Sequence, residues 1–361
     1  MVKKEAGRNA LLLQNNSASF ELPRRVYLTQ DINVSRFEVT ISRYQPGPDD
    51  ITAYVWTDSN GITREYALPP YYISNVAEAA VNLRVYARAA RREFTTALLA
   101  TSNPIIQKTF KEAERYYEAS KSDLVAAALL FFSSTRMIER FWLICGPDTL
   151  GIPAMDRNIG PCRYNPRVPA IPVTPVMDTQ LDELAIGSVL LPLSTNLLSL
   201  LKAKVLAKRK ENWYEIFLAS FIILHNAERV LDHIMDFSRR FGVNPESRGN
   251  KESSLSHAYY QACKTVLVYF HFASGGATPL LLDWLSPVQD SSTMTPEQIA
   301  YIRNIQAELA RQEADLHALK SAPMYETEMY WCHQMLVPNW KANMPHKGAF
   351  LEFTENDFLV T

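Results

Sequence analysis

The chain has 361 residues, of which 47% are hydrophobic and 21% are charged. This composition is ordinary for a folded protein and excludes a globally disordered chain. The 37 Lys and Arg residues nearly balance the 38 Asp and Glu residues, which gives a net charge of −1. A dedicated nucleic-acid binder needs a surplus of basic residues to neutralise phosphates, so we expect this chain not to bind nucleic acid directly.

The four cysteines, at positions 145, 162, 263 and 332, are widely spaced. Structural zinc sites use short spacings such as CxxC, and this sequence has none, so we expect no metal and no cofactor. Such thiols indicate a reducing compartment. The apolar run Leu11–Leu13 is too short for a signal peptide, and no apolar stretch reaches the ~20 residues of a membrane span. We expect an intracellular protein, nuclear or cytoplasmic and not secreted, with no membrane partner.

Residues 1–72 carry patterns typical of β structure. The segment Arg36–Ile41 alternates apolar and polar side chains, as a half-buried strand does. Two further runs, 51–56 and 62–66, flank the residues DSNG at 58–61, and an Asn-Gly pair between such runs predicts a hairpin. We expect this N-terminal extension to pack as a small β element against the rest of the chain.

From residue 73 onward the pattern is helical almost throughout. Apolar residues recur at three- and four-residue steps, and Ser, Asn, Pro and Gly mark helix starts and ends. The predicted helices span 76–102, 105–118, 123–145, 177–209, 212–241, 253–274, 296–319 and 326–337. The segment 146–175 is rich in proline and glycine, so no helix persists there, and Pro192 is expected to kink the helix 177–209.

These patterns together predict an all-α fold. The expected architecture is a large irregular helical bundle with a small N-terminal β-hairpin element. Residues 213–224 are apolar nearly all round, which is typical of a helix in the middle of such a bundle. The expected domains are the N-terminal extension, 1–72, and a helical domain, 73–361.

No recognised catalytic motif occurs in the sequence. It contains no GxSxG nucleophile elbow, no GxxxxGK[ST] phosphate loop, no GxGxxG and no HExxH. The catalytic residues, if any, are therefore unknown, and the sequence favours a protein that is not an enzyme.

One predicted helix face gathers an imidazole and two carboxylates. His225, Glu228 and Asp232 lie three and four residues apart within the helix 212–241. Helical bundles bind divalent metals with such groups when a facing helix adds further ligands. The sequence offers no matching pair on another helix, so we favour a helix lined by polar side chains over a metal site.

A second charged group lies on the predicted helix 123–145. Arg136, Glu139 and Arg140 are three and four residues apart on a helix whose other face is apolar. The arginines could receive an acidic ligand, but pairing with Glu139 explains them as well, and we favour this structural role. Bundles also build pockets between helices. The candidate ligand-binding residues are Arg136, Glu139, Arg140, His225, Asn226 and Glu228.

Five short blocks carry a resemblance to a known family. They are TRMIERFWLICG at 135–146, IPVTPVMDTQLD at 171–182, NWYEIFL at 212–218, LHNAE at 224–228 and YETEMYW at 325–331. In this order, and over residues 75–341 as a whole, the sequence resembles the helical regulatory region of fungal-specific zinc-cluster transcription factors. The ordered set is more specific than any single block.

Members of that family carry a six-cysteine binuclear zinc cluster that grips DNA, followed by a long helical region that regulates activity. Residues 1–72 contain no cysteine, so the zinc cluster is absent from this sequence. The resemblance implies that 73–361 is a regulatory, ligand-sensing domain of transcription regulation in secondary metabolism. It would act through protein partners of the transcription machinery, as a homodimer, or through a small-molecule ligand, without contacting DNA itself.

Two alternatives stay open. A standalone relative that lacks the cluster could be repurposed as a small-molecule enzyme, a cyclase or isomerase that uses an aromatic pocket. Such reactions can depend on pocket shape and electrostatics alone, so absent motifs do not exclude them. A chain of this kind could also sequester an intact transcription factor.

Overall fold

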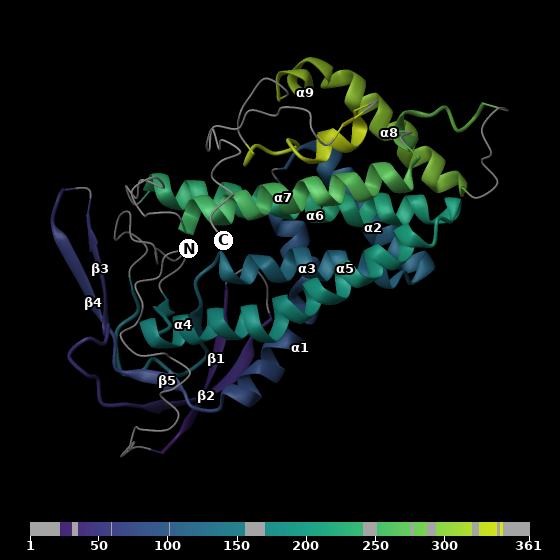
Figure 1. Ribbon diagram of the computed structural model, residues 1–361. Helices are drawn as coiled ribbons and strands as arrows, with labels where there is room; N and C mark the ends of the chain where they lie inside the picture. The colour runs from purple at the N-terminus through teal and green to yellow at the C-terminus, as the bar shows by residue number, and fades with distance from the viewer. Residues whose placement is uncertain are drawn as a thin grey trace, which may run out of the picture. The chain divides into compact units, whose positions relative to one another are not determined.

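The computed structural model describes residues 22–30, 35–58, 60–100, 102–155, 170–240, 251–275, 278–286, 294–319, 325–337 and 340–341 (Figure 1). The chain divides into two compact units, each held together by its own contacts. The mixed unit comprises 2–97 and 133–195, and the helical unit comprises 98–132 and 196–361. These units do not coincide with the predicted division between residues 72 and 73, which stays a prediction.

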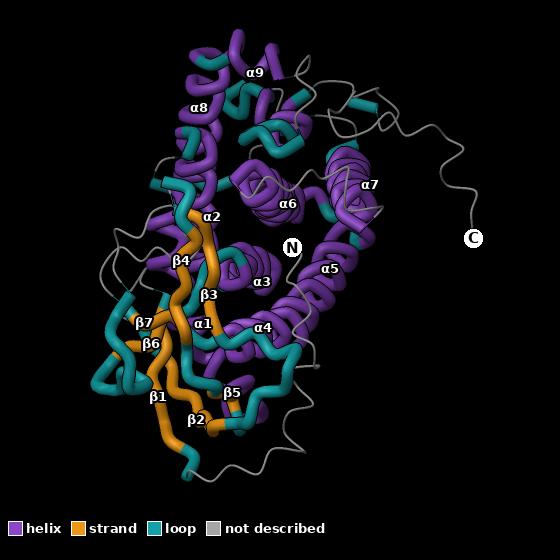
Figure 2. The backbone as a smooth tube through the Cα atoms, turned by 90° about the vertical axis from the view of Figure 1, so that its left-hand side faces the viewer, coloured by secondary structure: helices purple, strands orange, loops and turns teal. Residues whose placement is uncertain are grey.

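An antiparallel sheet of five strands belongs to the mixed unit (Figure 2). Its strands are β1 (Arg24–Thr29), β2 (Phe37–Arg43), β5 (Tyr71–Ile73), β6 (Leu143–Cys145) and β7 (Ile171–Pro172), in the order β5-β2-β1-β6-β7. In β2 the side chains of Phe37, Val39 and Ile41 are buried, and those between them are partly exposed. This alternation confirms the strand predicted over 36–41, because successive side chains of a strand point to opposite faces.

A separate hairpin is formed by β3 (Ala53–Thr57) and β4 (Thr63–Ala67), in which Tyr54 lies opposite Tyr66. The turn places Gly61 at a φ of 75°, where a residue with a Cβ is strained. The Asp58 carboxylate accepts a hydrogen bond from the backbone N–H of Ile62 at 3.0 Å. The hairpin predicted around the Asn-Gly pair is therefore confirmed.

The five-stranded sheet and the hairpin show that the predicted all-α fold is wrong, and the chain is mixed α and β. The error is clearest where helix α3 (Asp123–Thr135) ends before the predicted end at 145. The chain then makes a short 3-10 turn, Arg136–Ile138, and enters β6. In the sequence, Trp142 continues the three- and four-residue spacing of apolar residues that predicted a helix up to 145. In the structure its side chain is fully buried, and its ring centroid lies 5.1 Å from that of Phe37. Strands of two or three residues, such as β6 and β7, show no periodicity that a sequence can reveal.

The mixed unit also contains helix α4 (Pro175–Leu184) and most of helix α1 (Val76–Leu99). Asn75 caps the start of helix α1, because its side chain accepts a hydrogen bond from the backbone N–H of Glu78 at 3.1 Å. Helix α4 is joined to the sheet edge by Gln180. Its side-chain oxygen accepts from the N–H of Ile73 at 2.7 Å, and its amide donates to the carbonyl of the same residue at 3.2 Å.

Helical backbone continues from α4 through a π-helical turn, Ala185–Leu190, into α5 (Leu191–Leu206). Pro192 lacks the N–H of a regular helix, and it follows directly on the π-helical turn; the kink predicted at this proline stays a prediction. By length and composition this run suffices to cross a membrane, with an 18-residue window of mean hydropathy 1.8. A candidate membrane span was not predicted from the sequence, because only uninterrupted apolar stretches were considered. The finding is a weak indication, since core helices pass the same test.

The helical unit is built around α6. Its elements are α2 (Pro104–Ser120), α3, the C-terminal part of α5, α6 (Trp213–Arg240), α7 (Lys251–Ala273), α8 (Pro296–Arg311) and α9 (Glu313–Leu319), with 3-10 turns η4 (Lys210–Asn212), η5 (Pro279–Leu281) and η6 (Cys332–Leu336). Helix α6 packs against α2, α7 and η6. Nearly every residue from Trp213 to Leu224 is buried, so the predicted central helix is confirmed.

Two predicted helices of this unit have different ends in the structure. The helix 296–319 is interrupted at Gln312, which separates α8 from α9. The helix 326–337 is replaced by turns that lead into η6. Met329 has a φ of 71°, and a side-chain-bearing residue in this conformation cannot continue a right-handed helix.

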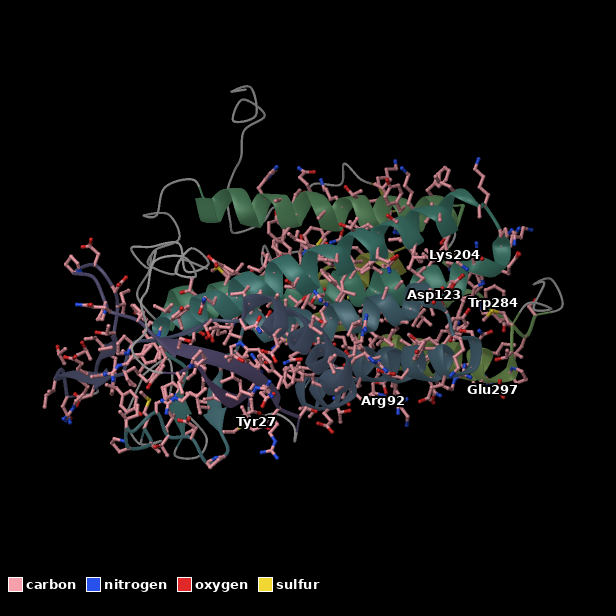
Figure 3. All side chains as sticks on the ribbon, turned by 90° about the horizontal axis from the view of Figure 1, so that it is seen from below. Tyr27, Arg92, Asp123, Lys204, Trp284 and Glu297 are labelled. Carbon is pink, nitrogen blue, oxygen red and sulfur yellow. The ribbon has the colours of Figure 1, made fainter. Side chains whose placement is uncertain are left out.

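Buried glutamates of the helical unit pair with basic side chains. Glu215 pairs with Lys204 of α5, and Figure 3 labels Lys204. In the same unit Glu112 pairs with Arg115 at 2.6 Å. These ion pairs compensate the charges of the two buried carboxylates.

Candidate functional site

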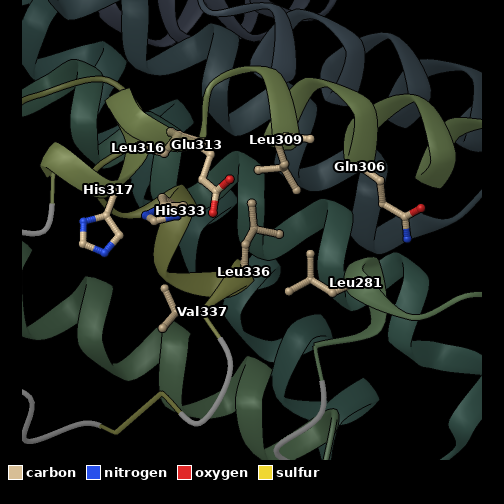
Figure 4. Close-up of a pocket in the computed structure, with 10 residues that line it drawn as sticks. Leu281, Gln306, Leu309, Glu313, Leu316, His317, His333, Leu336 and Val337 are labelled. Carbon is tan, nitrogen blue, oxygen red and sulfur yellow. The ribbon is translucent and has the colours of Figure 1, made fainter.

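The helical unit contains a cavity of about 370 Å³ bounded by η5, α8, α9 and η6 (Figure 4). Its lining is mostly aliphatic, with one amide, one carboxylate and two imidazoles. The lining residues are Leu281, Gln306, Leu309, Ala310, Glu313, Leu316, His317, His333, Leu336 and Val337. A cavity of this size is within the range of small-molecule sites, about 300–1,000 Å³.

Helix α8 positions much of the wall. It starts with a capping box, in which the side chains of Thr295 and Gln298 each accept a hydrogen bond from the other residue's backbone N–H. The lining residues of α8 and α9 then follow three or four positions apart, so they share one side. The Gln306 amide donates to the carbonyls of Leu280 and Leu282, both at 3.0 Å. These bonds hold η5 beside α8 and complete the wall.

The carboxylate and the two imidazoles of the wall lie at one end of it. Figure 4 shows Glu313, His317 and His333 on one side of the cavity, together with Leu316, and Leu281, Leu309 and Gln306 toward the other side. This arrangement suits a molecule with an apolar body and one polar group. The ten lining residues include no hydroxyl, thiol or amine nucleophile, so the wall suits binding better than covalent catalysis.

Three candidate ligand-binding residues, His225, Asn226 and Glu228, lie on α6 and are buried, and none of them lines the cavity. One oxygen of Glu228 lies 3.1 Å from Nδ1 of His225. The carboxylate also accepts hydrogen bonds from the backbone N–H groups of Met329, Trp331 and Cys332, at 3.1, 2.7 and 3.0 Å. Glu228 therefore anchors the segment that leads into η6, and a ligand-binding role for these three residues stays a prediction.

Asp232 does not join this group, although its spacing in the sequence placed it on the same helix face. Its side chain is 44% exposed and lies 3.5 Å from the guanidinium of Arg229. The imidazole and two carboxylates that the sequence placed together are thus not assembled around a common point.

The other three candidates, Arg136, Glu139 and Arg140, lie in the mixed unit and not in the unit that holds the cavity. Arg136 is fully buried and pairs with Glu139 at 2.9 Å, as the structural interpretation predicted. The side-chain amide of Gln30 donates to the carbonyls of Met137 and Arg140 at 2.8 and 3.3 Å. These contacts fix the turn between α3 and β6, and ligand binding by the three residues stays a prediction.

Sequence reasoning missed every residue of the cavity wall. The available signal was Glu313 and His317, one helical turn apart in the predicted helix 296–319. The contributions of η5 and η6, such as Leu281 and His333, come from segments that no local spacing connects. Only the packing of the helical unit brings them together.

His271 on α7 contacts η6, and we expect it to make the free energy of unfolding depend on pH. Its Nε2 lies 3.1 Å from the carbonyl oxygen of Gln334, and its ring stacks on Trp340 with centroids 4.8 Å apart. Burial lowers the pKa of His271 from its ordinary value of 6.5. As the pH falls, His271 therefore binds a proton in the unfolded chain before it does so in the folded protein. The stability that His271 contributes above its ordinary pKa is lost as the pH falls below that value.

We expect the free energy of unfolding to fall from about pH 7 to about pH 5, and to fall less in the variant His271→Asn, which keeps an N–H donor without titrating. Urea unfolding followed by circular dichroism at several pH values measures both slopes. Equal slopes in the two proteins would contradict this role of His271.

Residues 7–335 match the KpeA transcription factor family. The chain belongs to this family. The matched range includes eight of the ten residues that line the cavity, all except Leu336 and Val337. Membership confirms the resemblance to a fungal transcription factor that the ordered sequence blocks indicated.

One relative within the known proteins is the satratoxin biosynthesis SC3 cluster transcription factor SAT20 of Stachybotrys chartarum. It is 24% identical to the chain over 283 residues, which cover 75% of the chain and 39% of SAT20. The chain thus matches less than half of that relative's length. No solved structure gives a significant match to the chain.

Proposed function

We propose that this chain is a regulatory part of a transcription factor, and that a small, largely apolar effector binds in the cavity of the helical unit and alters its activity. The observation that carries the proposal is the cavity itself, in which an aliphatic wall ends at Glu313, His317 and His333. Membership of a transcription factor family supports the regulatory role.

Other parts of the proposal concern the setting in which the chain acts. The net charge of −1 supports a role that does not depend on direct contact with DNA. Protein partners of the transcription machinery or a second copy of the chain would transmit the effect, in the nucleus. The relative SAT20 is named for a toxin biosynthesis cluster, which supports regulation of secondary metabolism.

Filling the cavity tests the effector site. Leu309 lines the wall and is only partly buried, so the larger indole of Leu309→Trp can occupy part of the cavity. We expect the folded wild type to bind the apolar fluorophore N-phenylnaphthylamine. The affinity should fall at least about tenfold in the variant, which corresponds to roughly 1.4 kcal/mol. A fluorescence titration of both proteins measures the change.

The matched control is Leu285→Trp. Leu285 belongs to the same unit, is 60% exposed and does not line the cavity. This variant should bind the fluorophore as the wild type does. Equal loss in both tryptophan variants, or no loss in Leu309→Trp, would contradict a binding site in the cavity.

A further inference from the structure

A second group of polar side chains in the helical unit is completely enclosed. It consists of His225 and Glu228 on α6 and Cys332 at the start of η6. A nitrogen, an oxygen and a sulfur atom from these three residues all lie within 4.8 Å of one another. Each side chain is at most 1% exposed, so the group is shielded from water.

The charge of Glu228 sets it apart from other buried glutamates of this unit. Glu112, Glu215 and Glu308 each pair with a lysine or an arginine, as the partners Arg115, Lys204 and Lys108 show. Within the described residues, Glu228 forms an ion pair with His225 alone. A carboxylate in a dry interior needs compensating positive charge, and an imidazole supplies it only when protonated. A bound cation would therefore compensate the negative charge of Glu228.

A second thiol stands close to this group. Cys263 on α7 is fully buried. Burial raises the pKa of the Cys263 and Cys332 thiols, and the carboxylate of Glu228 raises the pKa of both further. A metal ion bound by Cys332 would stabilise its thiolate.

We propose that His225, Glu228 and Cys332 bind a divalent transition metal ion, and that zinc is the preferred ion. Imidazole, carboxylate and thiolate are the donors that zinc combines in proteins. Nδ1 of His225 and the nearer oxygen of Glu228 are 3.1 Å apart. Two such ligands at about 2.0–2.1 Å from a tetrahedral zinc ion lie roughly 3.3 Å apart, so little movement is needed.

The metal would take the place of the proton between His225 and Glu228. The carboxylate can keep the three backbone N–H groups that it accepts, since it offers about four lone-pair positions. Cys332 releases its thiol proton to solvent when it binds the ion. The metal would link α6 and η6, and η6 carries His333 and Leu336 of the cavity wall.

Cobalt(II) tests this site in the full chain, because thiolate ligation gives a charge-transfer band in the near ultraviolet. The protein is first reduced and freed of metal with a chelator. We expect one equivalent of Co²⁺ to produce the thiolate band and Zn²⁺ to displace it. In Cys332→Ser the affinity for Co²⁺ should fall more than about 100-fold. This exceeds the loss of about 10- to 100-fold that follows removal of a residue that only orients a metal ligand.

The control variant is Cys145→Ser, which removes a thiol of the mixed unit and should leave the cobalt spectrum unchanged. A wild type without a thiolate band, or equal Co²⁺ binding by the wild type and Cys332→Ser, would overturn the proposal. The wild-type spectrum decides the question even where Cys332→Ser fails to fold. The metal site does not depend on the effector proposal, since neither His225, Glu228 nor Cys332 lines the cavity.

Discussion

The variant Glu228→Ala should lose about 3–5 kcal/mol of the free energy of unfolding, the effect of removing one partner from a buried charged pair. The carboxylate is 1% exposed and accepts three backbone N–H groups besides its contact with His225. Its removal leaves these donors buried without an acceptor, and each such donor is costly. Urea unfolding of the metal-free protein, followed by circular dichroism, measures the loss.

Asp232→Ala is the matched control on the same helix. Asp232 is 44% exposed and lies 3.5 Å from the guanidinium of Arg229. An exposed pair of this kind contributes little, so the control should stay within about 0.5 kcal/mol of the wild type. If Glu228→Ala is no less stable than Asp232→Ala, the anchor between α6 and the segment before η6 does not exist as described.

The variant Arg136→Met should destabilise the protein by about 3 kcal/mol, because it keeps much of the side-chain volume but removes the buried guanidinium that pairs with Glu139. Arg136 is fully buried and lies 2.9 Å from the carboxylate of Glu139. The double variant Arg136→Met/Glu139→Gln should recover part of the loss, since it removes the charge of Glu139 as well. Thermal and urea unfolding of the single and double variants measure the coupling between the two residues.

Arg84→Met is the control for this pair, because Arg84 is an exposed arginine of the mixed unit on α1. It should unfold like the wild type. The result also separates the two interpretations of the charged group at 136–140. An Arg136→Met variant as stable as the wild type would favour a ligand-binding role for Arg136. A destabilised variant would favour the structural pair with Glu139.

Long helices were predictable from the sequence, and short strands were not. Helix α2 follows the periodicity and the Asn103 cap, and β3 with β4 follows the Asn-Gly turn. In contrast, β7 has two residues and β6 has three, too few for any period to appear. Their pairing joins the chain around 143 to that around 171, and such a contact depends on tertiary structure.

The candidate sites were predictable only in part, for the same physical reason. Spacing on one helix identified His225 and Glu228 as neighbours, and the structure places them in contact. It could not identify Cys332, which reaches Glu228 from a segment more than a hundred residues further along the chain. The cavity wall likewise combines α8, α9, η5 and η6. Sites built from several elements exist only after the helical unit has packed.

The most direct test of a regulatory role is a reporter assay in which the full chain is fused to an unrelated DNA-binding domain. We expect the fusion to change transcription from the reporter relative to the DNA-binding domain alone. The fusion that carries Leu309→Trp should differ from the wild-type fusion, because its effector cavity is filled. A wild-type fusion that leaves the reporter at the level of the DNA-binding domain alone would contradict the proposal that this chain regulates transcription.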